Sequence, residues 1–321
     1  IRDRKTYCLE PSVNAKNVSE TRAERSADPN INPLRRTARL IGLILLIFLG
    51  GWFIYSGLSA LGNFQKPEVR DVPLVLPPPP EINPRAITAL LEQDEILSLD
   101  DPLYISAEDA SEELDPDERV IGVVINGDAR AYPIPILSNH EIVNDVVGGE
   151  PVAVTWCPLC YTALVFSRSV AGHEGLLSFG VSGKLLYNTL IMYDRQTNTL
   201  WSQLYGAAVE GDLAGRTLGV FPSINTEWAA WQAQYPDSLV LGKHLTCEQY
   251  NCGTYSTNPR GSYDVDPYAS YYNTPYEGVI EYQIPRDEFT SEVKQRLLGL
   301  RVGGQAKAYA YKTLAQNPVI N

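Results

Sequence analysis

A stretch of 23 residues without a charged side chain, residues 40 to 62 (LIGLILLIFLGGWFIYSGLSALG), is the strongest constraint on how this 321-residue chain can fold. As a helix it would be about 33 Å long, at about 1.5 Å per residue, which is enough to cross the hydrocarbon core of a bilayer. We therefore predict one transmembrane helix at residues 40 to 62. A cleaved signal peptide ending near Ala60-Leu61-Gly62 is the competing interpretation, but about 40 polar residues is too long a leader.

The charges divide sharply on either side of this segment. Residues 1 to 40 hold 9 Lys/Arg and 5 Asp/Glu, a net charge of +4, which leaves 17 basic and 33 acidic residues, a net charge of −16, for the remainder. Arg35, Arg36 and Arg39 directly precede the apolar stretch, and such positive flanks stay in the cytoplasm. We expect a single-pass protein of the cell membrane with a polar cytoplasmic tail at residues 1 to 39. The acidic body also argues against nucleic acid as a partner.

A proline-rich segment follows the apolar stretch. Residues 63 to 85 include the run Pro77 to Pro80, and this composition favours an extended polyproline II linker that holds a domain away from the membrane. The remaining residues, 86 to 321, are predicted to form one extracytoplasmic β-rich domain.

The pattern of this domain predicts an α+β fold made mainly of antiparallel β hairpins with a few short helices. VIGVVI and ARAYP flank an Asn126-Gly127 turn, and IVNDVV and VAVTW flank Gly148-Gly149. YTALVFS and LLSFGV flank residues 171 to 175, and LIMYD and TLWSQ flank residues 195 to 198. Ser106 is a candidate N-cap of an acidic helix, and Asn225 or Thr226 of a helix at residues 225 to 235.

Two segments resemble each other without gaps. NGDARAYPIPIL (126 to 137) and GGQAKAYAYKTL (303 to 314) share the order of Gly, Ala, a basic residue, Ala-Tyr and Leu. A duplicated β unit and a chance match of two hairpins both explain this. A further segment, residues 250 to 277, carries seven tyrosines and is interpreted as a cover for the edge of the core, with a binding loop as the alternative.

The five cysteines are the main candidates for chemistry. Cys8 falls on the predicted cytoplasmic side, whereas Cys157, Cys160, Cys247 and Cys252 form two local pairs in a compartment where disulfides persist. The simplest interpretation is two structural disulfides, Cys157 to Cys160 and Cys247 to Cys252.

The sequence TWCPLCY (155 to 161) allows two further interpretations. A thioredoxin-like redox site needs a helix after the cysteines to stabilise the first thiolate, but YTALVF favours a strand. A metal site fits better, because two strands that meet at a C-P-x-C turn bring the thiolates together. His140, or the Cys247 and Cys252 pair, would supply the missing ligands, and sulfur with imidazole favours copper or zinc.

These motifs together are recognisable. The strings ING-ARAYP, HEIVND, VAVTWCPLC, FGVSG and MYDRQTNTLW, in this order, resemble the domain-of-unknown-function family numbered 3179, over about residues 85 to 315. The resemblance implies prokaryotic proteins that are often secreted or membrane-anchored, and no activity. It marks as motif positions His140, Glu141, Asn144, Asp145, Cys157, Cys160, Ser182, Tyr193, Asp194, Arg195 and Trp201.

The function expected from the sequence is that of a membrane-anchored binding or accessory domain. The sequence favours this binding role over an enzymatic one. Cys157, Cys160 and His140 would form its metal or redox site, and Glu141, Asn144, Asp145, Asp194 and Arg195 would support it. Two alternatives stay open: a thiol-disulfide oxidoreductase, and a structural subunit that contacts other membrane proteins through its helix and tail.

Overall fold

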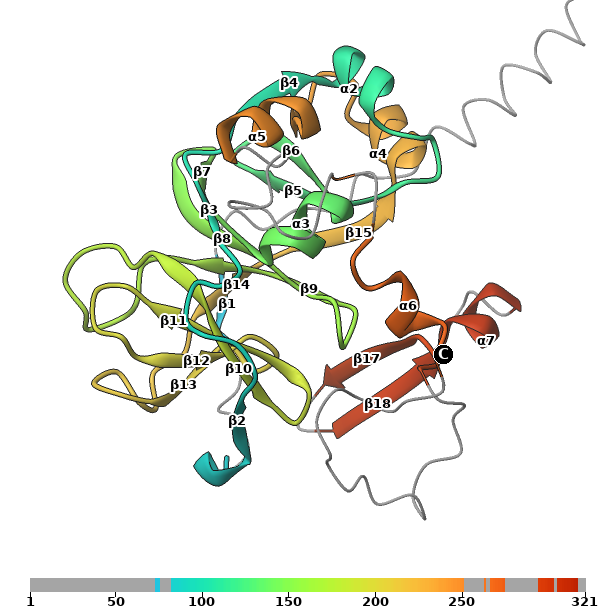
Figure 1. Cartoon of the computed structure of the whole chain (residues 1–321). Coiled ribbons are helices and arrows are strands. Elements are labelled where there is room, and N and C mark those ends of the chain that lie inside the picture. The colour runs from blue at the N-terminus through green and yellow to red at the C-terminus, as the bar shows by residue number, and fades with distance from the viewer. Residues whose placement is uncertain are drawn as a thin grey trace, which may run out of the picture. The chain divides into compact units, whose positions relative to one another are not determined.

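The computed structural model describes residues 73–75, 82–250, 263, 266–274, 294–302 and 305–316 (Figure 1). Within these residues, no helix has the length and apolar character needed to span a bilayer. The predicted cytoplasmic tail, the predicted transmembrane helix at 40–62 and most of the predicted linker lie outside the described residues. The predictions for the undescribed segments therefore stay predictions. Inside the predicted linker, Leu74 and Val75 pair with Val220 and Gly219, so these two residues belong to the folded domain.

Three sheets form the body of the domain. The first has the order β1-β14-β9-β8-β7-β3, the second β13-β12-β11-β10-β2 and the third β15-β5-β6-β16-β4. All pairings are antiparallel except β3 with β7 and β6 with β16. A fourth sheet holds only β17 and β18. The predicted α+β class, dominated by antiparallel strands with a few short helices, is confirmed.

The strand bounds are as follows. The first sheet contains β1 (Leu74–Val75), β3 (Leu99–Asp100), β7 (Ile142–Val147), β8 (Glu150–Cys157), β9 (Thr162–Ser167) and β14 (Gly219–Phe221). The second contains β2 (Ile87–Ala89), β10 (Phe179–Leu186), β11 (Thr189–Asp194), β12 (Leu200–Ser202) and β13 (Ala207–Glu210). The third contains β4 (Tyr104–Ser106), β5 (Arg119–Ile125), β6 (Asp128–Pro133), β15 (Ser223–Glu227) and β16 (Leu239–Leu241), and the fourth contains β17 (Leu297–Val302) and β18 (Gln305–Ala310).

The described helices are short, none longer than the eight residues of α5. They are α2 (Ala107–Glu113), α3 (Ile134–His140), α4 (Trp228–Gln234), α5 (Lys243–Tyr250), α6 (Ala269–Tyr272) and α7 (Tyr311–Gln316), with a 3-10 turn at Pro84–Ala86. Ser106 caps α2 as predicted, because its hydroxyl accepts a 3.0 Å hydrogen bond from the Asp109 N–H. The predicted capping of α4 is wrong: Asn225 and Thr226 pair with β5 inside β15, so the helix begins later.

Three of the four predicted hairpins form. β5 pairs with β6 around Asn126 and Gly127, whose φ angles of 49° and 81° fit a two-residue hairpin turn. β7 pairs with β8, and β11 with β12. The hairpin predicted from YTALVFS and LLSFGV is reduced to one antiparallel bridge, between Ser169 and Leu176, because β9 pairs with β8 and β14 while β10 belongs to the second sheet. Strand pattern alone does not distinguish a hairpin from a crossover between sheets.

The sheets stack as layers with separate apolar contacts. Val154 and Trp156 of β8 face the third sheet and α3, while Ala153 and Cys157 face the second sheet. The outer face of the third sheet is covered by α2 and α4, with Trp228 and Trp231 in that cluster. In Figure 1, α2 and α4 lie on one side of β5 and β6, and α3 lies on the other side. The first sheet is therefore the central layer, and the β8–β9 turn lies at its end.

The internal similarity has a structural counterpart. β5, β6 and α3 correspond to β17, β18 and α7 in the same order, and the pair Val120↔Pro133 matches Leu297↔Ala310. The correspondence extends beyond the segment found in the sequence, to Arg119 and Arg296. A hairpin followed at once by a helix, in the same register, indicates a duplicated unit rather than a chance match.

Candidate functional site

Both cysteines of the C-P-L-C segment lie at the β8–β9 hairpin turn. Cys157 is the last residue of β8 and pairs with Thr162 at the start of β9, and Tyr161 takes a left-handed conformation with φ of 53°. Cys157 and Cys160 are both free thiols. The interpretation of this turn as a stapling disulfide is therefore wrong, and the strand predicted after Cys160 is confirmed as β9.

The two sulfurs have unequal environments. Cys157 is buried in the core between the first and second sheets, and this burial raises the pKa of its thiol well above the ordinary value. Cys160 is only partly buried, and a hydrogen bond from the Cys157 thiol lowers the pKa of Cys160. The second cysteine is therefore the one that ionises first, and it is the more accessible of the two.

Groups around the turn favour the thiolates. Backbone groups of Leu190 and Cys160 favour the ionised form of Cys157, and the backbone and hydroxyl of Thr162 favour that of Cys160. The Cys160 thiol donates to the Cys157 carbonyl at 3.9 Å. The Thr162 hydroxyl also lies 3.1 Å from the Cys160 carbonyl oxygen, so it has one proton for two acceptors. Donors aimed at sulfur stabilise thiolates, which is what either a nucleophilic or a metal-binding thiol requires.

Gln203, which is distant in sequence, supports this turn through hydrogen bonds. The buried Gln203 side chain donates from Nε2 to the Thr155 hydroxyl at 3.1 Å and to the Thr162 carbonyl at 3.2 Å. Its backbone N–H donates to the Leu190 carbonyl at 3.1 Å. Gln203 thus ties together the strands that carry the sulfur-directed donors Leu190 and Thr162.

His140 does not join the cysteines. Its Nδ1 lies 2.7 Å from the Leu97 carbonyl oxygen and its Nε2 lies 2.5 Å from the Tyr263 hydroxyl, so both ring nitrogens are occupied elsewhere. In the part of the chain that the structure describes, no group of three or more His, Cys, Asp or Glu side chains is arranged to hold a metal ion. The expected ligand set of Cys157, Cys160 and His140 is therefore not assembled among these residues.

Tyrosines of the predicted cover segment lie over the turn. The Tyr271 hydroxyl donates to the Leu159 carbonyl at 3.3 Å, and the Tyr268 hydroxyl donates to Glu141 Oε1 at 3.0 Å. The Tyr161 ring lies 4.8 Å from Trp156 and 5.7 Å from Tyr272, centroid to centroid. These contacts agree with the predicted role of this segment as a cover, and they place Glu141 beside it.

The second cysteine pair is only partly described. Cys247, in α5, is disulfide-bonded, whereas its predicted partner Cys252 lies outside the described residues. The pairing of Cys247 with Cys252 therefore stays a prediction. Because Cys247 is already in a disulfide, it is not available as a thiolate ligand for the C-P-L-C turn.

Asp145 forms a separate polar cluster. Its carboxylate accepts hydrogen bonds from Tyr104, from Tyr132 at 2.5 Å and from Arg130 Nη1 at 2.9 and 3.0 Å. Its Oδ1 also accepts a 2.7 Å bond from the backbone N–H of Val146. This carboxylate is saturated by internal donors, as expected for a buried charge that stabilises a fold.

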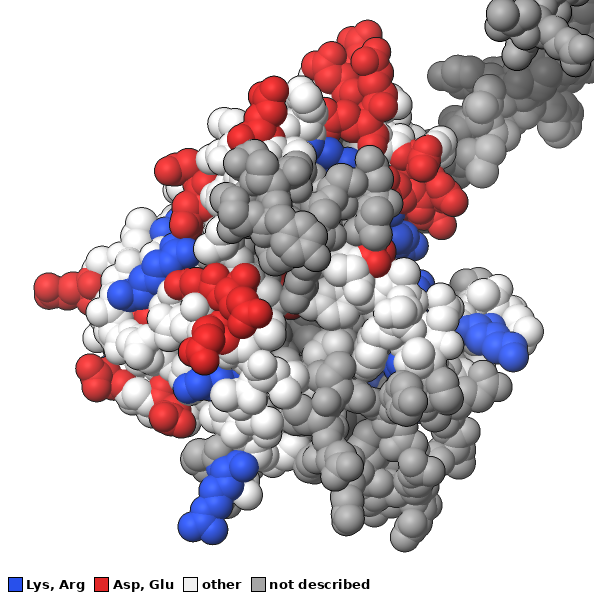
Figure 2. Space-filling view, in the orientation of Figure 1, with Lys and Arg blue, Asp and Glu red and all other residues white. Residues whose placement is uncertain are grey.

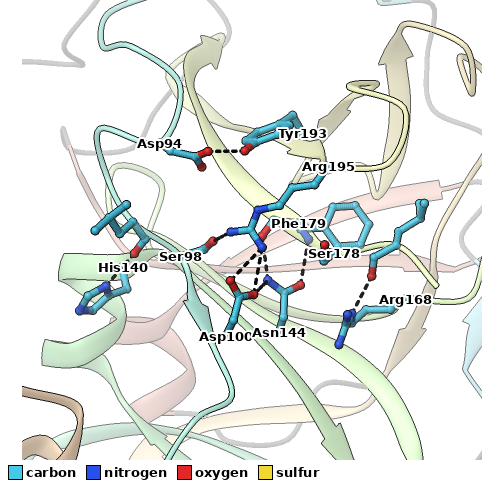
Figure 3. A network of polar contacts seen from close by, with 12 residues as sticks. Asp94, Ser98, Asp100, His140, Asn144, Arg168, Ser178, Phe179, Tyr193 and Arg195 are labelled. Atoms are coloured by element: carbon cyan, nitrogen blue, oxygen red, sulfur yellow. Dashed lines mark hydrogen bonds and ion pairs between the residues drawn. The ribbon is translucent and has the colours of Figure 1, made fainter. Parts of the chain in front are cut away.

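Asn144 and Asp194 also have structural roles. The Asn144 amide bonds to Phe179 in both directions, at 2.8 Å to its carbonyl and 2.8 Å from its N–H, and so joins β7 to β10 (Figure 3). Beside it, Arg195 forms an ion pair with Asp100 of β3 at 2.9 Å, between residues 95 positions apart in the chain. The fully buried Asp194 accepts bonds from Thr197 N at 2.6 Å and Trp201 Nε1 at 2.9 Å.

Comparison with known proteins decides the family. The profile of the family described as "Protein of unknown function (DUF3179)" matches residues 93–321, more than half of the chain. The chain belongs to this family. No curated protein and no solved structure matches at a significant level.

Three residues of the site in this DUF3179 member were not predicted from the sequence: Thr162, Gln203 and Tyr271. Thr162 follows Cys160 by two residues in a strand, which is the one signal that could have indicated it. Gln203 bonds to Thr162 across 41 positions of the chain, and Tyr271 bonds to Leu159 across 112 positions. Nothing in the local pattern around Gln203 marks it, whereas Tyr271 belongs to the tyrosine-rich segment predicted as a cover but was not singled out within it.

Proposed function

We propose that this protein is a membrane-anchored, extracytoplasmic domain that exchanges thiols and disulfides through Cys160 and Cys157. The observation that carries the proposal is the asymmetry of the two free thiols. A partly exposed thiol with a lowered pKa is suited to attack, and a buried neighbour with a raised pKa is suited to resolve the product. The order is the reverse of the one expected from the sequence, which assigned the reactive thiolate to Cys157.

The reaction balances with a disulfide of a substrate protein as the oxidant. The Cys160 thiolate attacks one substrate sulfur, which breaks the substrate disulfide and releases its other sulfur as a thiolate. Cys157 then loses its proton and attacks Cys160, which forms the Cys157–Cys160 disulfide and releases the second substrate thiolate. Two electrons pass to the substrate, and a dithiol donor is needed to reduce the domain again.

The location is proposed from the sequence. The uncharged residues 40 to 62 and the preceding Arg35, Arg36 and Arg39 support a single-pass anchor with the domain outside the cytoplasm. Contacts with other membrane-protein subunits through this anchor are part of the same proposal.

The test uses the full chain in detergent micelles, reduced and freed of reductant. Reduction of oxidised di-eosin glutathione is followed by its fluorescence. We expect Cys160→Ser to remove the reaction and Cys157→Ser to accumulate a mixed disulfide that mass spectrometry detects. The matched control is Cys8→Ser, which removes the tail thiol and should lower the signal only by the slow contribution of that one thiol. An unchanged rate in Cys160→Ser would contradict the proposal.

Binding of a soft metal ion is the second candidate, favoured by the donors directed at both sulfurs. Two thiolates without a third ligand suit copper(I) better than zinc, which takes four ligands in structural sites. Reduced chain should then compete with bicinchoninate for one equivalent of copper(I), and Cys157→Ser should lose it. If His140→Gln retains copper, the metal is held by the two cysteines without His140. If His140→Gln loses copper, His140 is a ligand, as expected from the sequence.

A further inference from the structure

The α6 segment, residues 266–274, lies over the C-P-L-C turn but is weakly anchored there. The α6 helix has only four residues, no hydrogen bond from a capping side chain and no buried residue. Tyrosine hydroxyls bond the segment to the body of the domain: Tyr271 donates to the Leu159 carbonyl at 3.3 Å, and Tyr268 donates to Glu141 Oε1 at 3.0 Å. Segments with few buried contacts belong to the least stable parts of a fold.

Two polar groups have no partner while the α6 segment covers the turn. The indole N–H of Trp156 and the hydroxyl of Tyr272 are buried, and neither has a hydrogen-bond partner among the described residues. Both side chains contact the ring of Tyr161, which follows Cys160 directly. A buried polar group without a partner raises the free energy of the state that buries it. Movement of the α6 segment away from the turn would expose the Tyr272 hydroxyl to water and remove its part of this cost.

Lys294 holds the α6 segment in place. Its ammonium donates to the Tyr271 carbonyl, and to the carbonyl and the hydroxyl of Thr274, at 3.0 Å each. The same ammonium lies 3.7 Å from the centroid of the Tyr271 ring. These contacts involve the segment and not the C-P-L-C turn, so Lys294 stabilises the covered state from outside the thiol site.

The α6 segment also lies close to both sulfurs. Burial, and then charges on Cys157 and Cys160, raise the pKa of Tyr271. Burial is the main cause of the raised pKa of Tyr272, and a charge on Cys157 adds to it. Charges shift a pKa in this way over only a few ångströms. The tyrosines of the α6 segment therefore occupy space that a bulky substrate needs at the thiols.

We propose that the α6 segment is a gate that opens to admit a bulky disulfide to Cys160, and that two adjacent tyrosines bias it in opposite directions. Tyr271 favours the closed state through its bond to the turn, and Lys294 favours it through its bonds to the segment. Tyr272 favours the open state, because its hydroxyl has no partner when the gate is closed. The substrate named here rests on the proposed thiol–disulfide exchange, whereas the motion of the gate does not depend on it.

Hydrogen exchange of the backbone amides in residues 266–274 measures opening without any thiol reaction. It is followed by mass spectrometry on the full chain in detergent micelles. We expect exchange to be roughly fivefold faster in Tyr271→Phe, which loses a hydrogen bond, and roughly fivefold slower in Tyr272→Phe, which loses only an unpaired hydroxyl. Lys294→Met loses three bonds and should accelerate exchange the most. Tyr311→Phe, at an exposed tyrosine outside the segment, is the matched control and should exchange as the wild type does.

Access to Cys160 is measured on the same variants with a small and a bulky reagent. The small reagent is iodoacetamide, and the bulky one is oxidised di-eosin glutathione. The ratio of the two rates cancels any change in the fraction of Cys160 that is ionised, because both reagents react with the thiolate. We expect the rate with the bulky reagent, relative to iodoacetamide, to rise in Tyr271→Phe and Lys294→Met and to fall in Tyr272→Phe.

The outcomes separate the gate from the thiol chemistry. Hydrogen exchange that is unchanged in both tyrosine variants, or that changes in the same direction in both, would overturn the gate. In a chain that reduces the disulfide, a ratio of thiol rates that does not follow the exchange rates would overturn it as well. If hydrogen exchange shifts in opposite directions but no variant reduces the disulfide, the gate is supported and the proposed thiol chemistry fails.

Discussion

Asp145 and Cys160 belong to neighbouring motifs of the same sequence, but their surroundings are opposite in kind. The Asp145 carboxylate is bonded by two tyrosine hydroxyls, a guanidinium and a backbone N–H, so nothing in it is left to react. Cys160 is a free thiol at a turn, partly exposed and with a lowered pKa. Motif residues therefore divide into those whose side chains are saturated by internal hydrogen bonds and those that keep an accessible ionisable group, and the hydrogen-bond partners separate the two groups.

The largest expected effect is a loss of stability when the polar cluster around Asp145 is disrupted. Asp145→Ala would leave Arg130 and the hydroxyls of Tyr104 and Tyr132 without their shared acceptor, and removing one partner of a buried ion pair costs about 3–5 kcal/mol. Urea unfolding of the full chain, followed by tryptophan fluorescence, measures this loss. The matched substitution Cys160→Ser should change the free energy of unfolding by less than about 1 kcal/mol. Similar losses for both variants would remove the distinction between the two regions.

The second-largest effect is a loss of stability at high pH, which acts through Tyr132 in the polar cluster around Asp145. Burial, then the charges of Tyr104 and Asp145, raises the pKa of Tyr132 well above its ordinary value, so the folded chain keeps this proton when the unfolded chain loses it. Stability should therefore be intact below pH of about 10 and fall above it, by about 1.4 kcal/mol per pH unit for this tyrosine. Unfolding midpoints measured between pH of about 9 and about 11 test the slope. Tyr132→Phe should show a shallower decline, and Tyr311→Phe, at an exposed tyrosine, should follow the wild type.

The smallest expected effect is a change in the reactivity of the Cys160 thiol. Thr162→Val removes a hydroxyl that favours the Cys160 thiolate, so the pKa of Cys160 should rise and its alkylation profile should move to higher pH. A hydrogen bond worth about 1 kcal/mol corresponds to a roughly fivefold slower reaction with iodoacetamide near neutral pH. Thr162→Ser, which keeps a hydroxyl, should restore the rate. An unchanged profile in Thr162→Val would show that Thr162 does not act on Cys160.

Much of the local structure follows from the sequence because it depends on short-range rules. Asn126-Gly127 and Gly148-Gly149 supply the positive φ angles that tight hairpins need, and Ser106 satisfies the first turn of α2. The strand after Cys160 was also predictable from its β-branched and aromatic residues. These features involve residues within a few positions of one another.

Which strands meet and which side chains share a site could be decided only by the tertiary structure. The partner of the strand that follows β9 depends on contacts between residues far apart in the chain. The same holds for the direction of the His140 ring, which contacts Tyr263 and not Cys157. The repeat is the clearest case: the sequence by itself determined that two segments share one pattern. Only the three-dimensional structure decided that Gly122 is covered by Trp231 and that no described atom covers Gly299, because burial of a strand face depends on what packs against it.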